Sequence, residues 1–195
     1  MRGLATDQGV RGQYPVRNRK TPEFAPHRKG IHCHSPHEDI MMITKEGVER
    51  AQQDWGEGIV GISRAYIVGE DYVKRAKDHI ESLYAYNIGP VLFKPTFASE
   101  DQFRSTIDGA LSYFVAENGL CPEDKGFAKK GWEKVRFENE NIAINDVTAM
   151  AMGNYFFTAP EGNEVKVEYS FVYILDKEGD LRIQLHHSSI PSGDN

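Results

Sequence analysis

Apolar residues recur at helical spacing through the middle of the chain and alternate with polar residues nearer its end. A first helix is predicted to begin after Thr44, which is a good N-cap residue. A second helix is predicted over about 70–87, where Gly89 and Pro90 stop it. Three glycines are expected to weaken or bend the first helix: Gly56, Gly58 and Gly61.

A short apolar strand is predicted over 91–93, followed by a third helix. Ser99 opens the run Ser-Glu-Asp-Gln, which fits a capping box and places the start of that helix there. Phe103 then falls on its core face, and Asn118 with Gly119 ends it.

From Lys134 onward the period changes to strict alternation, which is typical of half-buried strands. Four strands are predicted, over 133–140, 146–157, 164–175 and 181–190. Polar turns separate them, the first at 139–141. Helices followed by such strands predict an α+β fold, with N-terminal helices packed on one face of a curved antiparallel β-meander.

The last predicted strand ends in four polar side chains that can exchange protons: His186, His187, Ser188 and Ser189. A strand end of this composition indicates that the strand runs into a pocket. Adjacent strand residues point to opposite faces, so His186 and His187 cannot both bind one ion. A three-histidine zinc site therefore cannot be built from this motif alone.

A three-residue turn in the last hairpin pairs Tyr173 with Ile183 and, in a regular ladder, Tyr169 with His187. The aromatic face, which we expect beneath the helices, then ends in His187 and Ser189. A slip of one residue would exchange the two faces. Two further hydroxyls are expected near the same space, those of Thr96 at a strand end and Tyr113 at the edge of the third helix. Each can equally serve a local backbone bond.

The distribution of charge along the chain restricts the classes of partner that it is expected to bind. The chain has 195 residues and a net charge of -6, but its first thirty residues carry seven basic and two acidic side chains. The acidic remainder argues against nucleic acid as a partner of the folded part. We expect a basic, largely irregular arm over 1–42, one α+β catalytic domain over 43–191 and a tail over 192–195.

Two cysteines in a chain of this length do not indicate a fold held together by disulfide bonds. No apolar run in the sequence is long enough to span a membrane. The arm contains a cluster of histidines around Cys33 that we interpret as a surface loop with incidental metal affinity. A soluble protein is expected.

Several short motifs together resemble one enzyme family, and they cover about residues 43–191. They are Phe93–Thr96, Ala110–Phe114, Glu123–Phe127, Ala149–Gly153, Lys166–Phe171 and His186–Ser189. The sequence is similar to the iota class of carbonic anhydrase, which is related to the calcium/calmodulin-dependent kinase II association domain and to the cone-shaped nuclear-transport-factor-2-like fold.

The resemblance implies reversible hydration of CO2 to bicarbonate by a homodimer, in a bacterial cytoplasm or a plastid stroma. It implies a metal-free site, with manganese or zinc as the alternative. It assigns bicarbonate binding to Thr96, Tyr113 and one serine of Ser188/Ser189, with one histidine of His186/His187 beside it. Leu185 stands where some members carry a third histidine, which weakens the case for a metal.

Our hypothesis from these residues is that Ser189 and Tyr113 orient water and substrate and that Thr96 binds bicarbonate. His187 relays the proton, since a metal-free site needs a general base. One alternative is a non-catalytic oligomerisation module of the kinase-association type. Another is a cone-fold isomerase or cyclase, for which Asp146 and Glu168 are the available strand carboxylates.

Overall fold

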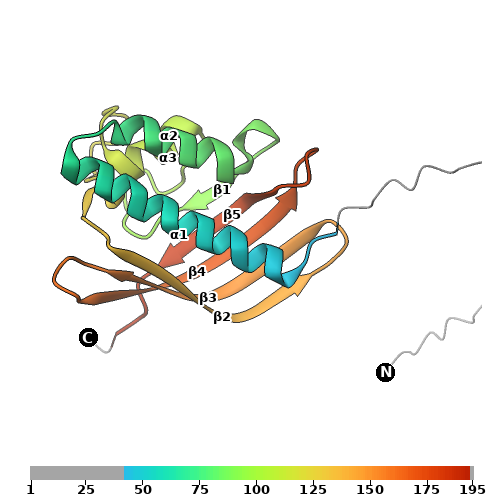
Figure 1. Cartoon of the computed structure of the whole chain (residues 1–195). Helices are drawn as coiled ribbons and strands as arrows, with labels where there is room; N and C mark the ends of the chain where they lie inside the picture. Colours follow the sequence, from blue (N-terminus) through green and yellow to red (C-terminus); the bar gives the residue numbers. More distant parts are fainter. Residues whose placement is uncertain (1–41, 194–195) are drawn as a thin grey trace, which may run out of the picture. The chain divides into compact units, whose positions relative to one another are not determined.

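The computed structural model describes residues 42–193 (Figure 1). Its helices and strands, in chain order, are α1 (Lys45–Val68), α2 (Tyr72–Leu83), the 3-10 helix η1 (Ala85–Asn87), β1 (Leu92–Lys94), α3 (Ile107–Val115), the 3-10 helix η2 (Phe127–Lys129), β2 (Lys134–Ile144), β3 (Thr148–Thr158), β4 (Glu164–Leu175) and β5 (Leu181–Ser189). The predicted arm and its histidine cluster lie almost wholly outside the described residues.

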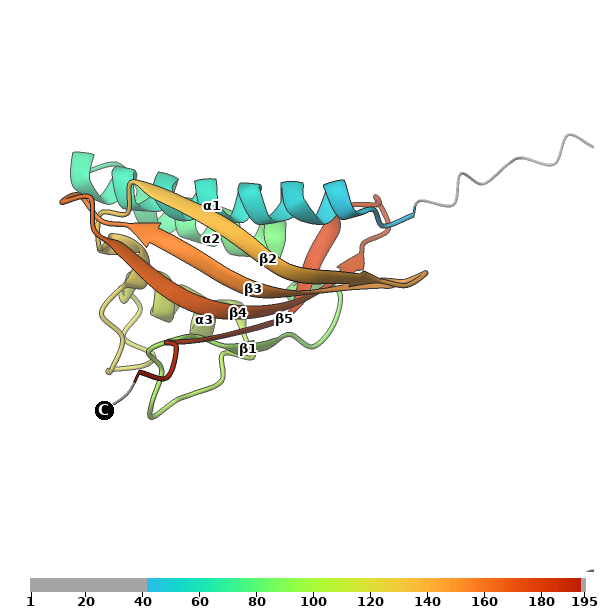
Figure 2. The ribbon, with the colours of Figure 1, turned by 90° about the horizontal axis from the view of Figure 1, so that it is seen from below.

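The five strands form one sheet in the order β1-β5-β4-β3-β2. Strands β2 to β5 make the predicted antiparallel meander, and the α+β class with helices over a curved sheet is confirmed (Figure 2). The sheet is mixed, however, because the short strand β1 pairs in parallel with β5, Phe93 opposite His186. This pairing brings the end of β1, and the loop that follows it, beside the polar end of β5.

Helix α1 runs without interruption through its three glycines, contrary to the expected bend. Thr44 caps it as predicted, its side chain accepting from the Gly47 backbone N–H at 3.0 Å. A Cβ atom on Gly58 would lie 2.1 Å from the ring of His79 on α2, and one on Gly56 would lie 3.1 Å from Val135. These glycines therefore permit close approach of α2 and β2 to α1.

The third helix begins at Ile107 with Thr106 as its N-cap, eight residues later than the predicted start at Ser99. Residues 95–106 form a loop, and Phe103 is 73% exposed where a core position was predicted. The capping-box prediction failed because the carboxylate of Glu123, distant in sequence, satisfies the backbone N–H groups of 99–101. The predicted turn at 139–141 is also wrong, since β2 passes through it with a bulge.

Strand β5 carries one extra residue, and this decides which side chains face the helices. Tyr173 pairs with Ile183 as predicted, but Val172 pairs with Leu185, so that Gln184 is unpaired. Such a β-bulge shifts the following residues by one position and exchanges their faces. His186 and Ser188 point inward and are 2% and 3% exposed. The prediction that His187 and Ser189 form the inward pair is wrong.

The core between sheet and helices is rich in aromatic side chains and holds His79 of α2 buried against Trp55 and Phe114. Its Nε2 has no hydrogen-bond partner among residues 42–193. Burial lowers the pKa of His79 from 6.5 to about 4, because a charged imidazole would lose its hydration there.

This buried imidazole predicts an acid-sensitive fold. As the pH falls from 6.5 to 4, His79 takes up a proton in the unfolded chain but not in the folded chain. The free energy of unfolding therefore falls by about 3 kcal/mol over this range. His79→Phe should remove this part of the decline. The measurement is urea unfolding of both proteins from pH 7.5 to 4.5, and parallel curves for the two would contradict the prediction.

Candidate functional site

Four hydroxyls from four parts of the chain meet at the polar end of β5, and we call them the hydroxyl cluster: Thr96, Tyr113, Tyr155 and Ser188. Thr96 Oγ1 donates to Ser188 Oγ at 3.0 Å. Thr96 also lies close enough to Tyr113 on α3 and to Tyr155 on β3 to lower the pKa of each phenol slightly. Thr96 is half-buried, whereas the other three are no more than 6% exposed.

The two tyrosines of the hydroxyl cluster stay protonated. Burial raises the pKa of Tyr113 and of Tyr155 far above the usual range, and hydrogen bonds from neighbouring hydroxyls offset only part of this rise. Tyr113 stacks on Phe127, with ring centroids 5.6 Å apart. The cluster is therefore a set of neutral groups that can donate hydrogen bonds, set in an aromatic wall.

His186 lies beside the cluster in the same wall. Its ring stacks on Phe93 at 4.6 Å and meets the edge of Phe171 at 4.3 Å. Nδ1 is 2.8 Å from the Tyr84 hydroxyl, and Nε2 is 3.5 Å from the Tyr155 hydroxyl. Burial, and then the charges of His187 and His79, lowers the pKa of His186 well below 6.5, so it is neutral.

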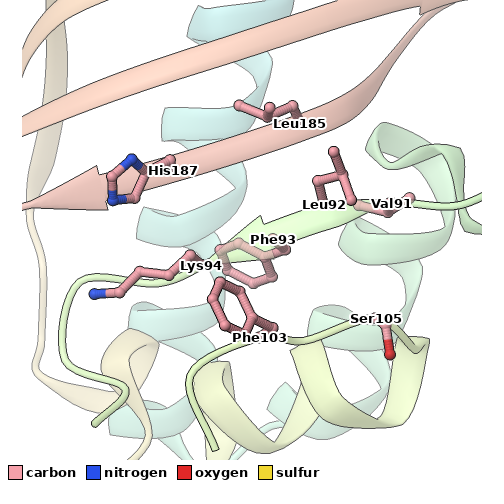
Figure 3. Close-up of a pocket in the computed structure, with 8 residues that line it drawn as sticks. All are labelled: Val91, Leu92, Phe93, Lys94, Phe103, Ser105, Leu185 and His187. Carbon is pink, nitrogen blue, oxygen red and sulfur yellow. The ribbon is translucent and has the colours of Figure 1, made fainter.

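The other two candidates from the sequence lie on the opposite face of β5. Ser189 donates to the Glu168 carboxylate at 2.9 Å. His187 is exposed and lines a separate apolar cavity of about 370 Å3 with Leu185 and Phe103 (Figure 3). Neither side chain reaches the hydroxyl cluster, so the roles assigned to Ser189 and His187 do not fit this geometry.

The loop that carries Thr96 is held by two acidic residues that follow α3. The carboxylate of Glu123 accepts from the Ser99 hydroxyl and from the backbone N–H groups of Ser99, Glu100 and Asp101. These bonds, the Ser99 side chain first, lower the pKa of Glu123 from 4.5 to about 2.

Asp124 extends this support to the third helix. Its carboxylate binds the buried guanidinium of Arg104 at 2.8 Å and accepts from Ser112 of α3 at 2.6 Å. Ser112 precedes Tyr113 in the chain. Asp124 therefore ties the Thr96 loop to the helix that presents Tyr113, and its carboxylate pairs the buried charge of Arg104.

Within residues 42–193, no three side chains of His, Cys, Asp or Glu are grouped so that they might hold a metal ion. In the same part of the chain, no helix has the length and apolar character needed to cross a membrane. His186 and His187 point to opposite faces, as the alternation of strand residues requires.

Residues 46–190 match the protein family described as metal-independent carbonic anhydrase. The chain belongs to this family. Metal-independent carbonic anhydrases interconvert CO2 and bicarbonate, and the family's description confirms the expectation of a site that needs no metal over the alternative of manganese or zinc.

Two similar proteins support the assignment to the metal-independent carbonic anhydrases. The metal-independent carbonic anhydrase of Nostoc sp. strain PCC 7120 is 45% identical over 152 residues, which cover 76% of this chain and 74% of that protein. The crystal structure of a cyanobacterial iota-carbonic anhydrase complexed with bicarbonate is similar, with a TM-score of 0.77 and 41% identity over 79% of this chain and 96% of that one.

Three residues close to the site could not be recognised as functional from the sequence: Tyr155, Tyr84 and Trp55. Tyr155 stands in a run of alternating apolar residues, where a tyrosine is indistinguishable from a core aromatic. The available signal was weak: an inward tyrosine, unlike phenylalanine, needs a partner for its hydroxyl. Glu123 and Asp124 were noticed only as part of a family motif.

The support of the Thr96 loop can be tested at Glu123. Glu123→Gln should speed hydrogen exchange at the amides of 99–101 and lower thermal stability at pH 7. The carboxylate contributes stability above pH 4.5, and this contribution is lost as the pH falls towards 2, so wild type and variant should converge in acid. Glu100→Gln, in the same loop, is the control, and an equal effect of both variants would contradict this account.

Proposed function

We propose that the hydroxyl cluster is the site where this enzyme binds bicarbonate and hydrates CO2. The observation that carries the proposal is the convergence of Thr96, Tyr113, Tyr155 and Ser188 at the end of β5, beside the neutral His186. Bicarbonate is a small anion that needs hydrogen-bond donors, whereas CO2 is apolar and needs a dry surface. Hydroxyls set in an aromatic wall meet both needs. The similar cyanobacterial enzyme was crystallised with bicarbonate.

The chemical step requires stabilisation of a growing negative charge. As water attacks the carbon of CO2, one electron pair moves from a C=O bond to its oxygen. Tyr113 and Tyr155 remain protonated and can donate to that oxygen in a water-poor setting, where such bonds are stronger than in bulk water. Ser188 and Thr96 can hold the other oxygens of the product.

The proton of the attacking water must leave the site. A hydroxyl can accept this proton while releasing its own. Once the two hydroxyls turn so that Ser188 donates to Thr96, the reverse of the resting direction, they can pass the proton across their 3.0 Å contact and on to a solvent water molecule. Thr96 is the half-buried member of the cluster and so the one nearest solvent. This path uses no charged intermediate deep in the core, which burial would penalise.

Single replacements at the two neighbouring serines distinguish this site from the one expected from a regular hairpin. Ser188→Ala should lower kcat/KM for CO2 hydration about 100-fold, because it removes the first hydroxyl of the proton path. Ser189→Ala, on the other face, should leave it nearly unchanged. Stopped-flow hydration with a pH indicator measures both, and a larger loss at Ser189 would overturn the assignment.

We also propose that residues 43–191 form one cone-shaped catalytic domain that pairs as a homodimer. The family match over 46–190 supports the domain limits. Apolar side chains on and beside the outer face of β3 support the pairing: Ile144, Val147, Met150 and Met152 are between 40% and 69% exposed. A soluble protein of a bacterial cytoplasm or plastid stroma stays a prediction.

Dimerisation through this face has a direct test. Met152→Glu places a charge on the apolar surface and should convert the dimer to a monomer in sedimentation velocity. Lys177→Glu, in the exposed turn between β4 and β5, changes the charge by more and should leave the dimer intact. A monomeric wild-type protein would contradict the proposal.

A further inference from the structure

A chain of hydrogen bonds leads from the middle of the core to the hydroxyl cluster. Trp55 Nε1 donates to the Tyr84 hydroxyl at 3.0 Å, and this hydroxyl is 2.8 Å from His186 Nδ1. His186 Nε2 is 3.5 Å from the Tyr155 hydroxyl. All four side chains are at most 2% exposed, so bulk water does not compete for these bonds.

The first member of this chain fixes the direction of the next bond. An indole N–H only donates, so the Tyr84 oxygen must accept from Trp55. The Tyr84 proton then needs an acceptor, and His186 Nδ1 is the one within reach among residues 42–193. The opposite arrangement, with a proton on Nδ1, would leave the Tyr84 proton buried and unpaired, which is unfavourable.

We propose that Trp55 and Tyr84 hold His186 as the neutral tautomer that carries its proton on Nε2. His186 is then a hydrogen-bond donor towards Tyr155 and cannot act as the general base. Trp55 and Tyr84 are positioning residues, since neither belongs to the hydroxyl cluster. The catalytic part of this inference rests on the proposed function of that cluster.

The tautomer has a consequence for the reacting groups. When the Tyr155 oxygen accepts from His186 Nε2, the Tyr155 proton is free to point at Ser188, Thr96 or a bound substrate. Every bond from Trp55 onward then runs in the same direction, and the chain delivers a donor to the place where oxygen becomes negative. A base at Nε2 would require Nδ1 to donate to Tyr84, and the Tyr84 proton would then have no acceptor among residues 42–193.

Nuclear magnetic resonance of the 15N-histidine-labelled full chain tests the tautomer without reference to activity. The chain has seven histidines, and His186→Gln identifies the signals of His186 by their loss from the spectrum. The expected spectrum shows a proton on Nε2 and none on Nδ1 of His186. A proton on Nδ1 in the wild-type protein overturns the proposal, whether or not the protein hydrates CO2.

Two tyrosine variants test whether Tyr84 sets the tautomer. Tyr84→Phe removes the donor to Nδ1 and should shift part of His186 to the other tautomer, with a fall in kcat of about tenfold. Tyr86→Phe is the matched control, because Tyr86 stacks on Tyr84 at 5.9 Å but gives its hydroxyl proton to the Arg104 carbonyl. An unchanged His186 spectrum in Tyr84→Phe would refute the role of Tyr84.

Two substitutions of His186 distinguish between its role as a hydrogen-bond donor and a role as the general base. The amide of His186→Gln can donate near the position of Nε2 but cannot take up a proton, so this variant should keep at least a fifth of the wild-type kcat. His186→Ala, which loses the donor, should lose more than 90%. Equal, near-complete loss in both variants, with folding intact by circular dichroism, would show that His186 is the base and overturn the proposal.

Discussion

The site depends on one irregular residue in the last strand. Because Gln184 is unpaired, the residues after it change faces, and the inward side of β5 ends in His186 and Ser188. In a regular ladder the positions opposite Phe171 and Tyr169 would hold Leu185 and His187, and the hydroxyl cluster would lack its serine. A bulge costs one pair of ladder bonds, yet it aims an imidazole and a hydroxyl into the core at once. Bulges next to active sites commonly have this effect.

The remaining members of the cluster come from elements that are tied to one another. Parallel pairing of β1 with β5 brings Thr96 to Ser188, and the carboxylates of Glu123 and Asp124 hold its loop against α3, which carries Tyr113. The bonds of the two carboxylates are charge-assisted, and those of Asp124 are partly buried, where such bonds are stronger than at the surface. These bonds hold a loop without regular structure in place and so position the Thr96 hydroxyl that it carries.

The sequence was sufficient for the elements whose periods were long and regular. It predicted the cap at Thr44, the four strands of the meander and the α+β class, and it drew attention to Thr96, Tyr113 and the strand end. It failed where distant contacts override local preference. Ser99 looks like a helix start until the carboxylate of Glu123 satisfies the same N–H groups.

The error at β5 has a different cause. Leu181, Ile183 and Leu185 alternate without a break, so nothing in the sequence marks the extra residue at Gln184. Only packing of the whole sheet against α1 and α2 selects the register. The inward side chains of the strand end, on which the proposed site depends, were thus predicted one position away from where the structure places them, and in a strand one position separates the core from the solvent.

The chemistry follows from what an aromatic core accepts. A buried charge is costly without a partner, and His186 accordingly stays neutral while Tyr113 and Tyr155 keep their protons. Such a core can offer a substrate neutral donors and an apolar surface. Neutral hydrogen-bond donors bind bicarbonate and the transition state of hydration more strongly than they bind CO2. The reason is that bicarbonate and the transition state carry negative charge on oxygen, whereas CO2 does not. An aromatic core with a few directed hydroxyls therefore suffices to bind the anion without a metal, provided that the donors already point at the place where charge develops. The buried indole of Trp55, which can only donate, gives that direction to the whole chain of bonds.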